Sequence, residues 1–371
     1  MSAKNGSTRS VRRIVGICLA VAFALSALFA STASAKTKPI NKTYLALGDS
    51  LAFGYSLQLY NENEAEGDPA AAFEHGYVND YDAKLKGHKE YALVNLGCPG
   101  ETSKSLIGNG PIGAALEGAF GATTEAPCAY QEAFNAFHKN GTGGPLHTPY
   151  VGKSQLEAAI EQIAIAAGTG KPVERLTLNI GANDELAVVH GCEKEVETEF
   201  INEGKSKYGA SPAEAVKHCL ESKVFSLVET IVKNTEAAGY AIRHGAEFGG
   251  VNYTGPITFV ASYDPYGAVL HAGEELLTGS TSLAALINLE EEHHFAQGFN
   301  PEAGEAGFEA CTANPLPVFN PKNKKEPVRL QAWTNMANTT SFEGKANGPD
   351  IHATPAGYMV MAKVIKKACG L

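Results

Sequence analysis

The stretch LALGDSLAFGY, Leu45 to Tyr55, joins a short apolar run to an abrupt polar break. Short apolar runs that end at Gly, Asn or Asp are typical of buried parallel strands, and this run ends at Gly48-Asp49-Ser50. Ser50 has two interpretations at such a strand end: a turn residue or helix cap, or a nucleophile presented at the edge of a sheet. The four residues Gly48–Leu51 do not decide between them, so the rest of the chain has to.

Other segments repeat the pattern of a short apolar run closed by a polar end. They are Tyr91–Leu96, Arg175–Ile180 and Ile257–Ser262, which together with Thr43–Leu47 make four predicted strands. A weaker fifth candidate lies at Pro317–Phe319 or Leu330–Trp333. Helical patterns lie between and after them: Ser154–Ala167 with Ser154 as N-cap, Pro212–Gly239 running on toward Gly249, Gly273–Gln297, and Thr354–Ala368. Alternating strands and helices predict a parallel sheet covered by helices on both faces.

Two long stretches interrupt this alternation and are expected to be insertions near residues 56–76 and 107–152 of one domain. Ser56–Gly76 is acidic, and Ile107–Gly152 is rich in Gly with apolar patches such as IGAALEGAF. Loops of this length in a compact domain are usually functional or disordered.

The N-terminal segment has the layout of a secretory signal. A basic segment, Met1–Arg13, precedes an apolar run, Ile14–Ala30, that is short for a membrane span, and Ala33-Ser34-Ala35 fits a small-x-small cleavage site. We therefore expect a signal peptide over 1–35, a single secreted domain over 36–371 and no stable membrane insertion. An uncleaved anchor is the alternative.

Charge and cysteine content bound the class of protein. The formal charge of −10 becomes more negative without the signal, which carries four basic residues and no acidic ones, and such a surface repels nucleic acid.

Six cysteines remain after residue 35: Cys98, Cys128, Cys192, Cys219, Cys311 and Cys369. An even count in an exported chain favours disulfides, and the spacing favours consecutive pairs, 98–128, 192–219 and 311–369, among the many possible connectivities. No Cys-x-x-Cys pair supports a zinc site, and Glu290–His294 does not match the His-Glu-x-x-His spacing, so we expect no metal.

Polar residues that follow the predicted strands would meet at one edge of the sheet, because ligands of open parallel sheets bind outside the carboxyl ends of the strands. These residues are Ser50 after the first strand, Gly97 and Gly100 after the second, Asn183 and Asp184 after the third, and Asp350 and His352 before the last helix. A hydroxyl, an imidazole and donors for an oxyanion are the groups that acyl transfer needs. No Gly-x-Ser-x-Gly elbow and no glycine-rich phosphate loop occur in the chain.

With these residues at the predicted strand ends, the chain resembles the SGNH, or GDSL, hydrolase superfamily of esterases and lipases. The resemblance lies in four ordered blocks: Gly48–Leu51, Asn95–Thr102, Gly181–Asp184 and Asp350–His352. The signal and the cysteines also resemble secreted actinobacterial members. The resemblance implies a flavodoxin-like three-layer α/β/α sandwich with a central parallel sheet of about five strands.

Carried over to this chain, the resemblance makes Ser50 the nucleophile and His352 the base. The oxyanion donors would be the N–H groups of Ser50 and Gly100 and the side-chain amide of Asn183. In the superfamily the carboxylate stands three residues before the histidine, and here that position is Pro349. Asp350 stands two residues before and can reach the imidazole if the segment is extended; otherwise the Pro349 carbonyl takes the role.

The resulting expectation is a secreted, cofactor-free, monomeric serine esterase acting on a small-molecule or lipid ester. The apolar segment Leu106–Phe120 favours lipid-like acyl groups, and acetylated sugars are the runner-up. The alternative from a different class is a secreted binding protein of the same fold without turnover. Asp184 is expected to cap the helix after the third strand, and Cys98 to be disulfide-bonded rather than a nucleophile.

Overall fold

The computed structural model describes residues 39–66, 73–128, 146–265, 288–289, 310–320, 326–336, 338–342, 344–346 and 350–369. The chain divides into two units, Met1–Pro39 and Ile40–Leu371, and the fold below is that of the second. Several predictions fall outside the described residues: the signal peptide over 1–35, the helix over Gly273–Gln297 apart from residues 288–289, the Glu290–His294 segment, and Pro349.

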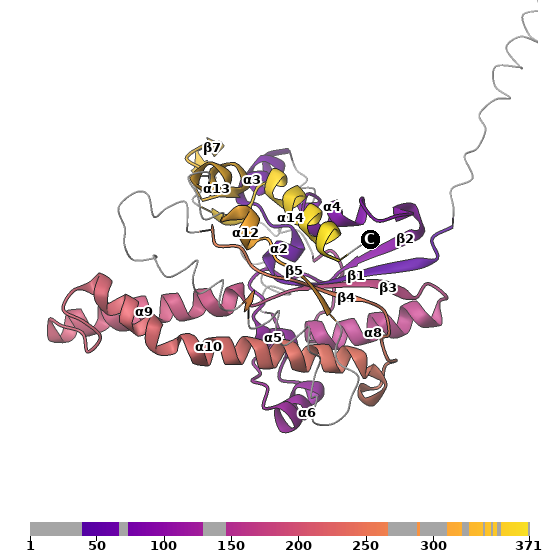
Figure 1. The fold of residues 1–371 in the computed structure, drawn as a ribbon, viewed down its shortest axis with the longest axis horizontal. Coiled ribbons are helices and arrows are strands. Elements are labelled where there is room, and N and C mark those ends of the chain that lie inside the picture. Colours follow the sequence, from indigo (N-terminus) through magenta and orange to yellow (C-terminus); the bar gives the residue numbers. More distant parts are fainter. Residues whose placement is uncertain are drawn as a thin grey trace, which may run out of the picture. The chain divides into compact units, whose positions relative to one another are not determined.

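A five-stranded parallel sheet forms the centre of this unit (Figure 1). Its strands are β1 (Lys42–Gly48), β2 (Tyr91–Asn95), β3 (Val173–Asn179), β4 (Ile257–Val260) and β5 (Ala310–Ala313). They lie in the order β2-β1-β3-β4-β5, and every neighbouring pair is parallel. This is the flavodoxin-like doubly wound order, which confirms the predicted fold class.

The fifth strand is not where the sequence placed it. Both candidate segments are helical, in α12 (Leu316–Phe319) and α13 (Glu326–Trp333), while β5 lies just before them. Proline is tolerated in the first turn of a helix, where its missing N–H has no partner to lose, and Pro317 stands there in α12, after Pro315 at the N-cap. The strand itself, ACTA, is too short and too weakly apolar to stand out as a pattern.

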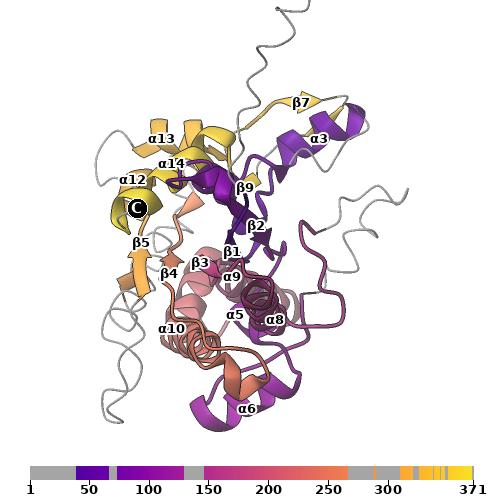
Figure 2. The same cartoon turned by 90° about the vertical axis from the view of Figure 1, so that its right-hand side faces the viewer.

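Helices cover both faces of the sheet. On one face lie α5 (Ser103–Ile107), α8 (Gln155–Gly168) and α10 (Pro212–Arg243), and on the other α4 (Tyr77–Asp82) and α14 (Pro355–Ala368). Figure 2 shows the sheet between the two helical layers. Successive side chains of a strand point to opposite faces, so Leu45 and Leu47 join one apolar cluster while Tyr44 and Ala46 join the other.

Capping side chains set where the covering helices begin. The predicted N-cap Ser154 is confirmed: its hydroxyl accepts from the Glu157 N–H while the Glu157 carboxylate accepts from the Ser154 N–H. Thr354 caps α14 in the same manner, by accepting from the Gly357 N–H. The cap at Thr354 fixes the end of the strand that carries His352.

The remaining elements lie in the insertions, at the edge that carries the site and in the connections before β2 and β4. They are α2 (Ser50–Phe53), α3 (Leu57–Glu66), α6 (Pro111–Phe120), α9 (Ala182–Glu203), the 3-10 turns His88–Glu90 and Gly245–Phe248, the antiparallel pair β6 (Thr334–Asn335) with β9 (Asp350–Ala353), and the pair β7 (Ser341–Phe342) with β8 (Lys345–Ala346). Helix α6 packs against α10, where the rings of Phe120 and Tyr240 lie 4.6 Å apart. Each of the two expected insertions therefore contains a helix.

Three disulfides join the six cysteines in consecutive order: Cys98–Cys128, Cys192–Cys219 and Cys311–Cys369. They close loops with sequence separations of 30, 27 and 58 residues. Loop closure of this length stabilises a folded chain by about 3–4 kcal/mol per bridge, by constraining the unfolded state. Among the described residues, no helix combines the length and the apolar character needed to cross a membrane.

Candidate active site

The end of β1 presents Ser50 at the carboxyl edge of the sheet. Gly48 has a φ of 142°, and a Cβ there would lie 2.2 Å from the Asn179 carbonyl oxygen on the neighbouring strand, so only glycine fits. Asp49 then caps α2 by accepting from the Leu51 N–H at 2.8 Å. The backbone conformation of Gly48 and the cap by Asp49 turn the chain sharply and leave Ser50 as the first residue of the helix.

A chain of short contacts runs from Ser50 through His352 to Asp350. The Ser50 Oγ lies 2.7 Å from His352 Nε2, and His352 Nδ1 lies 2.5 Å from Asp350 Oδ1. Ser50 is 302 residues away from His352 in the sequence, so the fold alone brings the two together. Asp350 and His352 are two residues apart on β9, and a strand points such residues to the same side.

The charge on Asp350 fixes the tautomer of His352. Burial raises the pKa of the Asp350 carboxyl, but the neighbouring His352 and the hydrogen bonds from His352 and from the Leu57 N–H outweigh burial, so the pKa is lower than usual. An ionised carboxylate only accepts hydrogen bonds, so His352 Nδ1 must donate to it. Nε2 is then the acceptor for the Ser50 hydroxyl proton.

Neighbouring groups hold this chain of contacts in place. The Leu57 N–H donates to the second carboxylate oxygen of Asp350 at 3.1 Å. The ring of Tyr55 packs against the His352 imidazole at 4.6 Å between centroids. Tyr263 is buried against Phe319, and its hydroxyl donates to the Ile351 carbonyl at 2.9 Å, so this side chain supports β9 rather than lining a pocket.

The three expected oxyanion donors lie on α2, on the loop after β2 and on α9. Gly100 adopts a φ of 82°, which favours glycine, in the loop that follows the strand. The Asn183 amide donates one hydrogen to the Glu101 carbonyl oxygen at 2.9 Å, which ties α9 to this loop. An amide nitrogen carries two hydrogens, so one remains for a further acceptor.

With this geometry in place, the chain can be compared with known proteins. No protein-family model matches it, and no curated protein matches it either. Three solved structures are similar over 90% of this chain and 97% of their own. They are an α/β hydrolase from the metagenome of Lake Arreo, Spain (11% identity, TM-score 0.37), a GDSL-like lipase from Parabacteroides merdae (13%, 0.38), and a catalytic mutant of an acetylxylan esterase from Geobacillus stearothermophilus (11%, 0.32). At these identities and TM-scores the likeness carries no weight for function, which rests on the geometry of the site.

Gln155 joins the end of β1 to the loop that follows β2, a role that the sequence pattern did not reveal. Its Oε1 accepts from the Gly48 N–H at 2.6 Å, and its Nε2 lies 2.9 Å from both the Gly48 and the Leu96 carbonyl oxygens. The same nitrogen lies 2.9 Å from a carboxyl oxygen of Glu101. Both side chains are completely buried. The sequence signal for this role was a glutamine at the first position of α8, on the face of the helix that is otherwise apolar.

Burial sets the protonation of Glu101 and of the other buried carboxyl groups near Gln155. Burial raises the pKa of Glu101 to about 8, against hydrogen bonds from Ser105 and Tyr150 that lower it. Burial likewise raises the pKa of Asp49 to about 7 and that of Asp184 to about 6. Glu101 is therefore mostly neutral at pH 7, whereas Asp350 is ionised. The two pKa values differ because Glu101 is buried with no cation beside it among the described residues, whereas Asp350 lies next to His352.

Glu101 is expected to make the protein less stable as the pH rises. A carboxyl group whose pKa is higher in the folded state stabilises the fold fully below its unfolded pKa of 4.5 and loses that effect as the pH rises through about 8. We expect the free energy of unfolding, measured with urea, to fall by several kcal/mol between pH 5 and pH 8.5. Glu101→Gln should remove the part that Glu101 contributes, while other buried acids, among them Asp49 and Asp184, contribute the rest. The exposed Glu161→Gln is the matched control and should keep the wild-type slope. An unchanged slope in Glu101→Gln would show that Glu101 does not carry the effect.

Asp184 does not cap the helix that carries it. Gly181 is the N-cap residue of α9 and forms no side-chain cap, which corrects the expectation from the sequence. The Asp184 carboxylate instead accepts from the N–H and the hydroxyl of Ser103, at 2.7 and 2.8 Å, in the first turn of α5. A carboxylate at a helix start is favoured by the unpaired N–H groups there, whichever chain segment supplies it.

Cys98, in the loop that follows β2, is bonded to Cys128. Cys98, Glu101 and Cys128 place potential metal-ligating atoms within 4.8 Å of one another. Both sulfurs belong to the disulfide, however, and the thiolate is the form of cysteine that binds a metal. The two cysteines therefore have a structural role as a disulfide.

Proposed function

We propose that the protein is a serine esterase that hydrolyses carboxylic esters through an acyl-Ser50 intermediate. The observation that carries the proposal is the continuous contact from the Ser50 hydroxyl through His352 to the Asp350 carboxylate. A hydroxyl is a weak nucleophile until a positioned base removes its proton, and this arrangement supplies such a base together with a group that orients it.

In the proposed reaction, the Ser50 oxygen attacks the ester carbonyl carbon while its proton passes to His352 Nε2. Asp350 accepts the Nδ1–H throughout and stabilises the imidazolium that forms. The N–H groups of Ser50 and Gly100 and the free amide hydrogen of Asn183 donate to the oxyanion. His352 then gives its proton to the departing alcohol, and water, deprotonated by the same imidazole, releases the acid and restores Ser50. These steps need no cofactor.

A fluorophosphonate probe tests this proposal against a binding protein of the same fold. The probe reacts with an activated serine, so the wild-type protein should gain the mass of one phosphonyl group on the peptide that contains Ser50. Ser50→Ala should take up no label, while Ser226→Ala, on the exposed face of α10, should be labelled like wild type. An intact wild-type protein that stays unlabelled would contradict the esterase proposal and favour the binding protein.

The acyl group of the ester is a separate question. Leu106, Ile107 and Leu116, in the segment expected to line an acyl chain, are fully buried in the apolar cluster between the sheet, α8 and α10. These side chains therefore stabilise the core, and they lend no support to a preference for lipid-like acyl chains. The sugar-ester alternative draws its support from the pocket described below.

We also propose that the domain acts outside the cell, after removal of residues 1–35. Three disulfides support this, because disulfides persist in oxidising compartments and are rare in the cytosol.

A further inference from the structure

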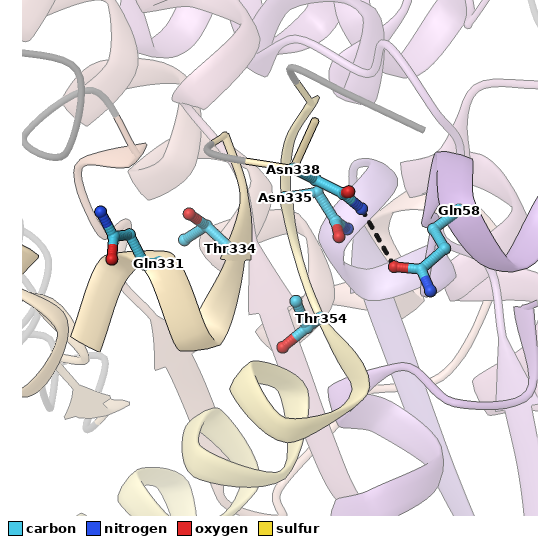
Figure 3. A pocket seen from close by; sticks show the side chains of 6 residues that line it. All are labelled: Gln58, Gln331, Thr334, Asn335, Asn338 and Thr354. Carbon is cyan, nitrogen blue, oxygen red and sulfur yellow. Dashed lines mark hydrogen bonds between the residues drawn. The ribbon is translucent and has the colours of Figure 1, made fainter. Parts of the chain in front are cut away.

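A pocket of about 430 Å³ lies beside the strand that carries Asp350 and His352. Figure 3 shows the side chains that line it: Gln58, Gln331, Thr334, Asn335, Asn338 and Thr354. Its volume is within the range of ordinary small-molecule sites, about 300–1,000 Å³. The mechanism above uses none of these six residues.

Among the described residues, the lining consists of four carboxamides and two threonine hydroxyls, all neutral and polar. A carboxamide offers two donor hydrogens and an acceptor oxygen, and a hydroxyl offers both functions on one atom. Ligands rich in hydroxyl groups, which also donate and accept, match such a lining. An acyl chain finds no apolar wall among these residues, and an anion or a cation finds no opposite charge.

Three of the lining residues connect the pocket to β9, the strand that carries Asp350 and His352. Asn335 on β6 pairs with Asp350 on β9, and Thr334 pairs with Ala353, the residue after His352. Gln58 directly follows Leu57, whose N–H donates to the Asp350 carboxylate. A molecule in this pocket therefore lies next to the residues that orient His352.

Part of the lining is held in place by bonds within the protein: the hydroxyls of Thr334 and Thr354 donate to backbone carbonyl oxygens, and the Asn338 oxygen accepts from Thr340. Asn338 Nδ2 donates to Gln58 Oε1 at 3.1 Å, across the pocket, as the dashed line in Figure 3 shows. Asn335 is 1% exposed, and its amide makes only a long contact of 3.4 Å, with the Ser56 hydroxyl. No group among the described residues donates to its Oδ1 or bonds the exposed Gln331 side chain. A ligand hydroxyl would supply a donor for this oxygen.

We infer that this pocket binds a neutral saccharide, as the subsite for the alcohol part of the ester that Ser50 attacks. The binding site stands on the pocket alone, whereas its place in the reaction rests on the proposed esterase function. The inference makes the natural substrate an acylated sugar.

Binding can be measured without turnover, in the Ser50→Ala protein. Cellotriose, maltotriose and xylotriose are titrated in turn and followed by saturation-transfer NMR and calorimetry. At least one should bind, and Gln331→Ala and Asn338→Ala in the same background should each weaken it about 2–10-fold, as expected for the loss of one net hydrogen bond. Asn202→Ala, an exposed amide on α9, is the matched control.

If none of the three trisaccharides binds, or if both pocket variants bind like the control, the inference is overturned. Labelling by the fluorophosphonate probe is read separately. A protein that is labelled but binds no saccharide keeps the esterase proposal and loses the subsite. A protein that binds a saccharide through Gln331 and Asn338 without being labelled keeps the binding site and loses the reaction.

Discussion

Ser50→Ala is expected to lower kcat for p-nitrophenyl acetate by a factor on the order of 10⁶, the size of the loss when a serine hydrolase loses its nucleophile. The reason is geometric: the Ser50 oxygen lies 2.7 Å from the base that would activate it, and alanine leaves His352 with nothing to deprotonate. The remaining rate should come from substrate binding and the oxyanion donors.

The Ser50 experiment needs two checks. Ser50 is 8% exposed at the start of α2, so urea unfolding should show whether the alanine variant keeps the wild-type stability. Ser226→Ala removes a hydroxyl that bonds only within α10, to the Lys223 carbonyl, and should keep the wild-type kcat. If Ser50→Ala retains more than about one hundredth of wild-type kcat, another residue is the nucleophile.

Asp350→Asn is expected to lower kcat by a factor on the order of 10²–10⁴, with a smaller change in KM. The Asp350 carboxylate accepts from His352 Nδ1 and stabilises the imidazolium, and a neutral amide can do neither as well. An asparagine can also present its NH₂ group to Nδ1, which would force the wrong tautomer and remove the acceptor at Nε2. The measurement is kcat and KM on p-nitrophenyl acetate between pH 6 and pH 9.

Asp80→Asn is the matched control for this charge change. Asp80 lies on α4, where its carboxylate is 3.9 Å from the Lys84 ammonium, and a partly exposed pair of this kind contributes little. We expect this variant to stay near wild-type kcat. A correctly folded Asp350→Asn within about threefold of wild type would assign the orientation of His352 to a backbone group instead.

The sequence by itself determined four of the five strands and the polar residues that follow three of them. Four apolar runs predicted β1 to β4 to within a few residues, because a strand buried on both faces must be apolar throughout. Ser154 predicted the start of α8 because a cap acts on N–H groups two or three residues away. Residues after parallel strands share one edge, so Ser50, Gly100 and Asn183 could be expected near one another, whereas His352 lies on the separate antiparallel pair β6–β9.

Only the tertiary structure decided the features whose partners are distant in sequence. The short β5 exists because β4 pairs with it, and its own residues carry too weak a pattern. Asp184 bonds Ser103, 81 residues away, rather than its own helix. Gln155 binds Gly48, 107 residues away, and the pocket joins Gln58 to Asn338 across 280 residues. A local pattern records which residues must be buried or capped, but hydrogen bonds between distant segments depend on packing that no short stretch contains.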